Sequence, residues 1–390
     1  SDEEIAELID RRMDVCMEEQ PEEFPQTLGE RLKLHRELFD SFRRLDILQE
    51  LVDDPRVTEI MVNGPDQVFV ETGGKIGRWE KSFESREQLE DLIQQIVSSV
   101  NRIVNTSMPL ADARLSDGSR VHVVLEPIAL NGPILTIRKF PEPMTMERLL
   151  DYGSISPEAA DLLKTLVAAR YNIFVSGGTG AGKTTFLNAL SEFIPPGERV
   201  ITIEDAAELQ LNHIENLVRM ETREANAEGA GAIGIGELIR AALRMRPDRL
   251  IIGEVRGKEA LDLLQSLNTG HDGGFSSGHA NSVKDMLSRL ETMVLMAADL
   301  PLAAIRSQIA SAVDIMVHVS RMRDKTRKVT AIEEVDRFEN GEIILNPLFT
   351  FREAEKAGDG FGNTGKVEGS LEQIGTLKHR EKLRLAGYRV

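Results

Sequence analysis

The sequence predicts an α/β protein, in which a parallel sheet covered by helices follows a smaller α+β domain. In the second half of the chain, apolar runs at residues 172–176, 200–203 and 250–253 alternate with longer segments of helical periodicity, as is typical of a parallel sheet. In residues 57–140, short β-branched runs are separated by turn residues such as Asn63-Gly64-Pro65. We expect strands there, together with one helix over residues 85–104.

Changes in composition divide the chain into five segments. Residues 1–50 hold 15 acidic and 7 basic residues, and apolar residues between Leu32 and Leu48 recur at helical spacing, which predicts helices with one buried stripe. Pro141 and Pro143 predict a stiff linker, because proline fixes φ and restricts the residue before it. The predicted segments are an N-terminal helical segment (1–50), the α+β domain (51–140), a linker (141–150), the parallel α/β domain (151–355) and a glycine-rich, peripheral C-terminal tail (356–390).

The composition excludes several classes of protein. The longest apolar stretch, residues 290–305, contains Glu291 and Asp299, so it cannot cross a bilayer. No signal segment opens the chain, and we expect a cytoplasmic protein without direct membrane insertion. The net charge of −17 argues against direct binding of nucleic acid. The single cysteine, Cys16, excludes a disulfide framework and a cysteine-built zinc site.

The strongest motif is a complete phosphate-binding loop (P-loop) at residues 177–184, between an apolar run and a segment of helical pattern. Its glycines let backbone N–H groups converge on phosphate oxygens at the positive end of a helix. Lys183 would reach the β- and γ-phosphates of ATP, and the Thr184 hydroxyl would hold Mg²⁺. The predicted nucleotide-binding residues are Gly177, Gly178, Thr179, Gly180, Ala181, Gly182, Lys183, Thr184 and Thr185.

Two acidic sites follow, each at the end of a predicted strand. Glu204 and Asp205 follow residues 200–203, and Glu254 follows residues 250–253. The carboxyl ends of parallel strands line one crevice, so these acids could orient the attacking water and fix the hydration shell of Mg²⁺. A solvated acid is the alternative at each position, and Asp205 could instead cap a helix.

Histidines and arginines supply the remaining candidates. The glycine-rich segment 270–279 contains His271 and His279, and His279 could donate a hydrogen bond to the γ-phosphate. Phosphoryl transfer in P-loop enzymes often uses an arginine from the same chain or a neighbour. The candidates are Arg114, Arg120, Arg138 and Arg240. From residue type alone, a structural role for either histidine and simple surface solvation for each arginine remain open.

Taken together, the motifs resemble those of the type II/type IV secretion ATPases, and most closely the CpaF-type motors of Tad pili. The P-loop, an Asp box at 201–209, an atypical Walker B at 250–254 and a His box at 270–279 occur in family order. Walker B has Gly253 before Glu254 where many P-loop enzymes have an acidic pair, and no four-cysteine zinc module is present. The resemblance implies a RecA-like ATPase domain preceded by a PAS-like domain.

The resemblance also implies roles that spacing cannot assign. Glu204 would be the general base for water, Glu254 the Walker B carboxylate near Mg²⁺, and His279 a sensor of the γ-phosphate. Arginines of the N-terminal domain would reach the nucleotide, which makes Arg114, Arg120 and Arg138 stronger candidates than Arg240. The family assembles as a homohexamer that acts on integral inner-membrane pilus platform proteins.

Three alternatives follow from the same residues. A conjugation or effector-type IV secretion ATPase would use the same chemistry on another machine. A nucleotide-gated scaffold would bind ATP and change shape with negligible turnover. A DNA-translocating motor conflicts with the charge of −17 and the 5% aromatic content.

Overall fold

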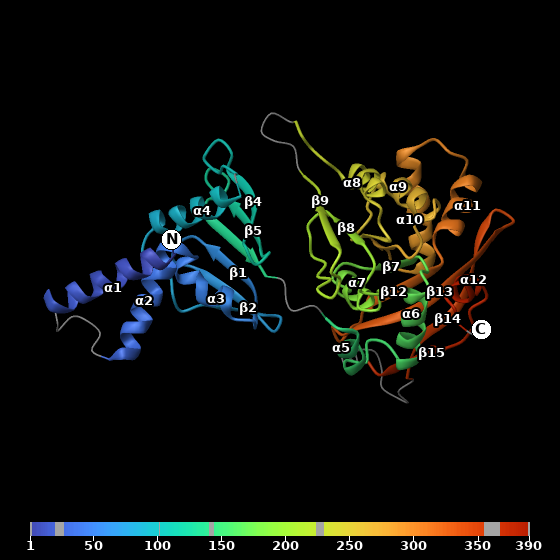
Figure 1. Cartoon of the computed structure of the whole chain (residues 1–390), viewed down its shortest axis with the longest axis horizontal. Helices are drawn as coiled ribbons and strands as arrows, with labels where there is room; N and C mark the ends of the chain where they lie inside the picture. The colour runs from blue at the N-terminus through green and yellow to red at the C-terminus, as the bar shows by residue number, and fades with distance from the viewer. Residues whose placement is uncertain are drawn as a thin grey trace. The chain divides into compact units, whose positions relative to one another are not determined.

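The protein, represented here by a computed structural model, divides into two compact units, residues Ser1–Glu142 and Pro143–Val390 (Figure 1). The structure describes residues 2–19, 27–100, 102–139, 144–223, 230–354 and 367–388. Each unit has its own hydrophobic core.

The first unit is an α+β fold built on one antiparallel sheet. The sheet has the strand order β3-β2-β1-β6-β5-β4. Residues that alternate along the strands, such as Ile60, Val121 and Ile137, are buried in one core with the apolar side of α4. The elements are α1 (Asp2–Glu19), α2 (Leu28–Arg43), η1 (Asp46–Leu48), α3 (Gln49–Asp53), β1 (Val57–Asn63), β2 (Val68–Thr72), β3 (Lys75–Arg78), α4 (Arg86–Ser99), β4 (Leu110–Arg114), β5 (Arg120–Val124) and β6 (Ile134–Arg138).

Two expectations for this unit need correction. The helix predicted over residues 85–104 ends at Ser99, whose hydroxyl donates to the carbonyl of Ile96, an alternative to continuing the helix. The stripe predicted between Leu32 and Leu48 is not uniformly buried, since Leu48 is fully buried whereas Leu32 is 64% and Phe42 65% exposed.

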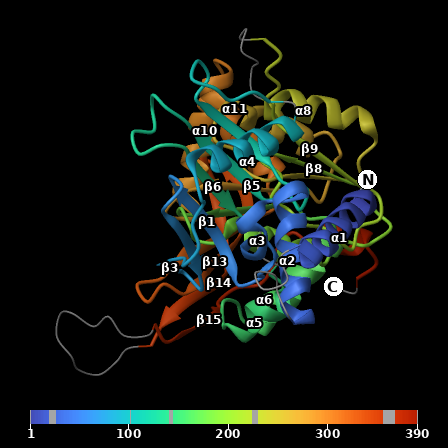
Figure 2. The ribbon, with the colours of Figure 1, turned by 90° about the vertical axis from the view of Figure 1, so that its left-hand side faces the viewer.

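The second unit is a three-layer α/β fold with a nine-stranded sheet in the order β15-β14-β13-β12-β7-β11-β10-β8-β9. Strands β12, β7, β11, β10, β8 and β9 are parallel to one another. Strands β13, β14 and β15, labelled in Figure 2, extend the sheet antiparallel. The elements are α5 (Met146–Asp151), α6 (Pro157–Ala168), β7 (Ile173–Gly177), α7 (Lys183–Ser191), β8 (Val200–Glu204), β9 (Leu217–Glu221), α8 (Ile235–Ala242), η2 (Leu243–Met245), β10 (Arg249–Ile252), α9 (Glu259–Leu267), β11 (Phe275–His279), α10 (Val283–Ala297), α11 (Leu302–Ala312), β12 (Ile315–Arg321), β13 (Arg327–Glu339), β14 (Glu342–Glu353), β15 (Gly369–Gln373) and α12 (Glu381–Leu385).

The two faces of this sheet pack against different helices. In β7, Val175 belongs to the core shared with α5, α6 and α7, whereas its neighbour Phe174 belongs to the core shared with α8, α9, α10 and α11. This is the alternation expected of a strand buried on both sides. The strands predicted at 172–176, 200–203 and 250–253 are confirmed as β7, β8 and β10.

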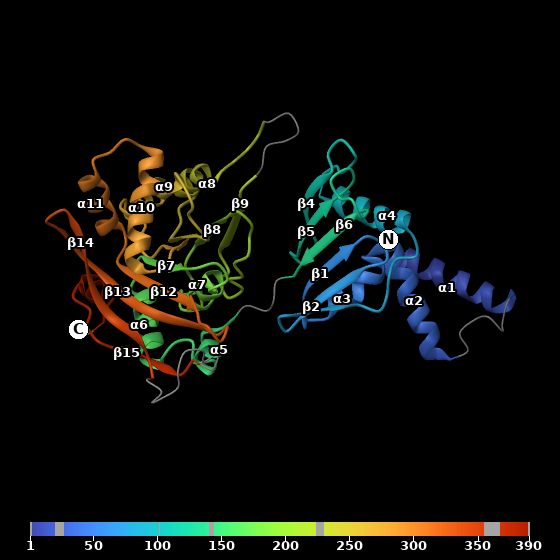
Figure 3. The same cartoon turned by 180° about the vertical axis from the view of Figure 1, so that it is seen from behind.

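The segments expected to be linker and tail contribute to the second unit. Helix α5 begins at Met146 within the expected linker 141–150 and ends at Asp151, one residue beyond it, and its Met146 is buried in the core. Pro141 and Pro143 lie outside the described residues. Beyond residue 366, β15 pairs with β14 at the edge of the sheet (Figure 3), and Leu371 and Leu383 are buried.

Within the described ranges, no single helix is long and apolar enough to cross a bilayer. Helices α10 and α11 together are long and apolar enough, but the chain bends by 119° between them.

Candidate nucleotide-binding and catalytic site

The P-loop joins the end of β7 to the start of α7. Gly180 and Gly182 have φ values of 70° and 93°, in the left-handed region that favours glycine. A Cβ on Gly177 would lie 2.4 Å from the carbonyl oxygen of Val319 on β12. The backbone of the loop therefore requires glycine at these three positions.

Lys183, His279 and Glu254 come together beside this loop. Lys183 is 7% exposed, and its Nζ lies 3.1 Å from Nδ1 of His279 and 3.4 Å from the carbonyl oxygen of Gly178. His279 ends β11, where it is paired with Gly177 across the parallel ladder. Its Nε2 lies 2.9 Å from Oε1 of Glu254, which follows β10. Three residues from separate motifs thus form one contiguous group.

The surroundings of these side chains shift their protonation. Burial lowers the pKa of Lys183, against the opposing attraction of Glu254. Burial, followed by repulsion from Lys183, lowers the pKa of His279 as well. A neutral imidazole has one acceptor nitrogen and one N–H group, so His279 can accept from the Lys183 ammonium and present an N–H toward Glu254.

Counting the described residues only, Glu254 has one carboxylate oxygen with a hydrogen-bond partner and one without. Its Oε1 atom is buried and has no hydrogen-bond partner among the described residues, although Nε2 of His279 lies 2.9 Å away. Its other oxygen accepts from Nη2 of Arg256 at 3.3 Å. No group of three or more metal-ligating side chains occurs in the described part of the chain. One carboxylate and the Thr184 hydroxyl fit Mg²⁺, which keeps several waters and binds phosphate oxygens.

Glu204 occupies a different environment at the end of β8. It is 3% exposed, and its Oε2 accepts from the backbone N–H groups of Glu208 at 2.8 Å and Leu209 at 3.0 Å. Burial raises the pKa of Glu204 to about 7, although these hydrogen bonds oppose the shift. No helix begins at Asp205, so the capping alternative for Asp205 is wrong.

The unusual glycine of Walker B is explained by this carboxylate. A Cβ on Gly253 would lie 2.9 Å from Cγ of Glu204. Gly253 also donates its N–H to the carbonyl of Ile203 at 2.9 Å, so the backbone cannot shift away easily. The Glu204 side chain therefore occupies the space that a larger residue at position 253 would need.

Comparison with known proteins decides the family. The family described as Type II/IV secretion system protein matches residues 43–348. The chain belongs to this family. A Mycobacterium tuberculosis protein named for conjugal transfer is 39% identical over 293 residues, covering 73% of this chain and 83% of the relative. Type IV secretion system protein PtlH of Bordetella pertussis is 35% identical over 291 residues, covering 68% and 86%.

Solved structures support the fold of this secretion-family protein. The pilus retraction motor PilT with bound ADP has a TM-score of 0.55 at 21% identity, covering 70% of this chain and 77% of PilT. The Legionella pneumophila ATPase DotB has a TM-score of 0.54 at 18% identity, covering 77% and 81%. The predicted α/β fold is thereby confirmed. The relatives named here concern conjugal transfer and type IV secretion, so the CpaF-type assignment stays a prediction.

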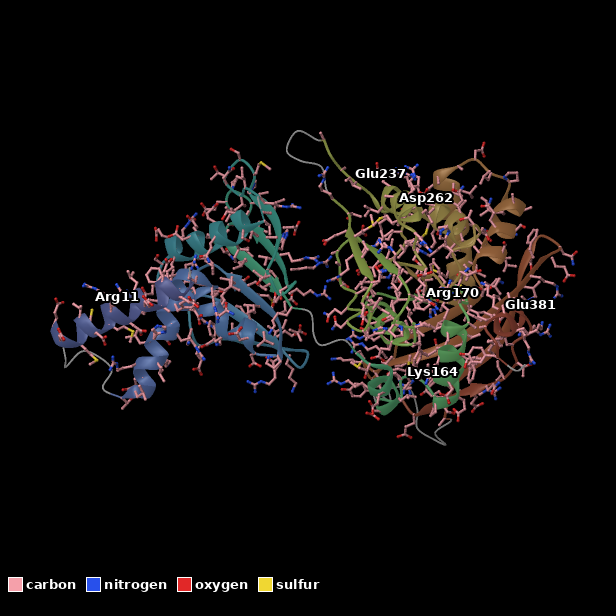
Figure 4. All side chains as sticks on the ribbon, in the orientation of Figure 1. Arg11, Lys164, Arg170, Glu237, Asp262 and Glu381 are labelled. Carbon is pink, nitrogen blue, oxygen red and sulfur yellow. The ribbon has the colours of Figure 1, made fainter. Side chains whose placement is uncertain are left out.

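The candidate arginines of this secretion-family protein fall into two groups. Arg240 on α8 lies 2.7 Å from Asp262 on α9, and both helices carry labelled residues in Figure 4. Arg114, Arg120 and Arg138 lie in the first unit, where Arg114 pairs with Arg120 and Arg120 pairs with Arg138 across adjacent strands. Opposed residues of antiparallel strands share a face, so these three form a row on the face opposite the buried residues Val121 and Ile137.

The glycine-rich His box packs closely at its beginning and places His279 beside the P-loop at its end. A Cβ on Gly274 would lie 2.5 Å from Cδ2 of Leu267, and Oδ1 of Asn172 accepts from the N–H groups of Gly273 and Gly274 at 2.8 and 3.1 Å. His271 precedes β11, whereas His279 ends it. The structure therefore places only His279 with Lys183.

Three arginines near the P-loop are not among the residues predicted from the sequence. Arg256 contacts Glu254, and its Nη1 lies 3.7 Å from Oδ2 of Asp205. Arg321 and Arg327 lie beside the loop glycines Gly180 and Gly182. The signal for the latter pair was present as a turn rich in cations, residues 321–328, between two β-branched runs.

Proposed function

We propose that this chain is a motor ATPase that hydrolyses Mg²⁺-ATP to drive a conjugation, type IV secretion or Tad-type pilus machine. The observation that supports it most strongly is the convergence of Lys183, His279 and Glu254 at a P-loop of glycine-dependent geometry. A pilus motor and a secretion motor would both use this chemistry. The family resemblance adds a homohexameric ring, a cytoplasmic location and recruitment by inner-membrane platform proteins.

In this proposal the two acids have distinct roles. Glu254 fixes Mg²⁺ with Thr184, and the metal supplies charge neutralisation at the phosphates. Burial raises the pKa of Glu204 to about 7. Glu204 accepts the proton of the attacking water, because a base whose pKa is near the working pH is effective. Lys183 holds the phosphate oxygens, and His279 contacts the γ-phosphate.

The test combines nucleotide binding with turnover. Lys183→Ala should abolish binding of a fluorescent ATP analogue, while Lys164→Ala, an exposed lysine on α6 (Figure 4), should bind as wild type does. Glu204→Gln should bind ATP and release phosphate far more slowly. Wild-type turnover in Lys183→Ala would defeat the P-loop assignment.

Three further outcomes discriminate among the alternatives. If only Glu254→Gln binds without turnover, the roles of the two acids are reversed. Tight ATP binding with negligible turnover at every protein concentration would favour the nucleotide-gated scaffold. Turnover per chain that increases as hexamers form, measured with mass at each concentration, would support a ring motor.

A further inference from the structure

A basic β-hairpin lies against the P-loop on the side away from His279. Arg321 at the end of β12 is directly paired with Arg327 at the start of β13, so both side chains project from the same face. Nε of Arg327 lies 3.4 Å from the carbonyl oxygen of Gly180. Nη1 of Arg321 lies 4.0 Å from the position of a Cβ on Gly180, and Cγ of Arg327 lies 3.8 Å from that on Gly182.

The hairpin turn is held in place by its own hydrogen bonds. Met322 donates its N–H to the carbonyl of Thr326 at 2.8 Å. Asp324 accepts from the N–H and hydroxyl of Thr326 at 3.0 and 2.6 Å, and from the N–H of Val367 at 2.7 Å. The strand ends that carry Arg321 and Arg327 are therefore fixed relative to the P-loop.

The two arginines differ from the other cations of this turn. Arg323 forms an ion pair with Glu353. Neither Arg321 nor Arg327 forms an ion pair with an acid among the residues that the structure describes, and both are exposed. In a chain of net charge −17, two such guanidinium groups beside a phosphate-binding loop indicate an anionic ligand.

The order of the strands indicates which part of the ligand they meet. Strand β7 lies between β11 and β12. Lys183 and His279 lie on the β11 side, where the proposed function places the γ-phosphate. The amides of the P-loop bind the phosphates along the loop. A nucleotide whose γ-phosphate lies on the β11 side therefore extends across the P-loop toward β12.

We propose that Arg321 and Arg327 bind the α-phosphate end of the nucleotide. They line the β12 side of the site, opposite Lys183 and His279 on the β11 side. This inference rests on the proposed function. Because the α-phosphate is present in both ATP and ADP, the two arginines contribute equally to the binding of each. They set affinity, whereas His279 and Glu254 respond to the γ-phosphate and the metal.

The experiment compares three variants that each lose one positive charge from the same hairpin: Arg321→Gln, Arg327→Gln and the control Lys325→Gln. Dissociation constants for ATP and ADP are measured by calorimetry at one fixed salt concentration. We expect about a tenfold loss of affinity in each arginine variant, equal for ATP and ADP, since a charge-assisted hydrogen bond contributes about 1.5 kcal/mol or more.

Lys325→Gln should bind both nucleotides as wild type does, because Lys325 lies at the turn rather than beside the loop. Equal loss in Lys325→Gln would reduce the effect to general electrostatics and overturn the inference. Unchanged affinity in both arginine variants, with wild-type binding intact, would overturn this inference alone. Wild-type protein that binds neither nucleotide would overturn the proposed function as well.

Discussion

At the residue scale, Glu204 carries an ionisable carboxyl group in a deeply buried position. Its carboxyl is 3% exposed and its pKa is raised to about 7 by burial. A carboxyl whose pKa is higher in the folded than in the unfolded state stabilises the fold below the unfolded pKa. That contribution is lost as the pH increases toward the folded pKa.

This linkage predicts how Glu204→Gln changes stability with pH. The amide is neutral at every pH, so the variant should gain stability relative to wild type as the pH increases from 5 to 8. Unfolding by urea, followed by circular dichroism across this range, measures the difference. A stability difference that does not change with pH would contradict a raised pKa for Glu204, whatever the variant does to turnover.

Gly253 gives a second prediction at this scale. Gly253→Ala places a Cβ 2.9 Å from Cγ of Glu204, and such overpacking typically costs about 1–3 kcal/mol. In a Glu204→Ala background the obstructing Cγ is gone, so the cost should fall below about 1 kcal/mol. A four-member cycle of urea unfolding experiments checks this coupling. Equal costs in both backgrounds would show that the two residues do not compete for space.

At the element scale, the sequence was informative wherever a buried parallel strand ended in a motif. The strands predicted at 172–176, 200–203 and 250–253 are sufficient to place Lys183 and Glu254 on one edge of the sheet. The glycine of Walker B could be seen in the sequence, but its cause depends on the distance to the Glu204 side chain. That contact joins residues from different strands, and only their alignment in the sheet determines it.

The antiparallel extension of the sheet was not predictable in the same way. β13, β14 and β15 add to the edge next to β12, and β15 follows a glycine-rich segment that favours a loop. Its pairing with β14 is set by contacts distant in sequence. For the same reason, residues 321–328 could not be placed beside the P-loop.

A buried ion pair joins several elements of the second unit. Arg249 at the start of β10 is fully buried and contacts Glu198, and it donates to the carbonyls of Val167 at 2.7 Å and Gly273 at 3.2 Å. Arg249→Met should destabilise the protein by about 3–5 kcal/mol, because it leaves a buried acid with its main partner removed. Guanidinium unfolding measures the loss.

Arg170 provides the matched control for Arg249. It also contacts Glu198, at 3.2 Å, but its side chain is 41% exposed, and Figure 4 labels it. Arg170→Met should cost at most about 1 kcal/mol, as exposed ion pairs usually do. Equal costs for the two variants would mean that burial does not determine the contribution of this arginine pair.

At the scale of the whole molecule, the first unit carries a row of three arginines that are candidates for a role in catalysis. Arg114, Arg120 and Arg138 lie side by side on β4, β5 and β6. Three guanidinium groups in one row form a cationic surface that suits an anionic ligand. The family resemblance predicts that this anion is the nucleotide, reached within the chain or from a neighbour in the ring.

Mixing two inactive variants distinguishes these cases. Arg120→Ala retains Glu204, and Glu204→Gln retains Arg120. In a head-to-tail ring with random equal mixing, about a quarter of the interfaces would combine an intact base with an intact neighbouring arginine. Phosphate release should then recover to about a quarter of the wild-type rate if Arg120 acts on a neighbour. In the control mixture, the double variant Arg120→Ala/Glu204→Gln replaces Glu204→Gln. No subunit of this mixture retains Arg120, so the recovery should be abolished. No recovery in the first mixture, with mixed rings confirmed by native mass spectrometry, would assign Arg120 to the site of its own chain or to none.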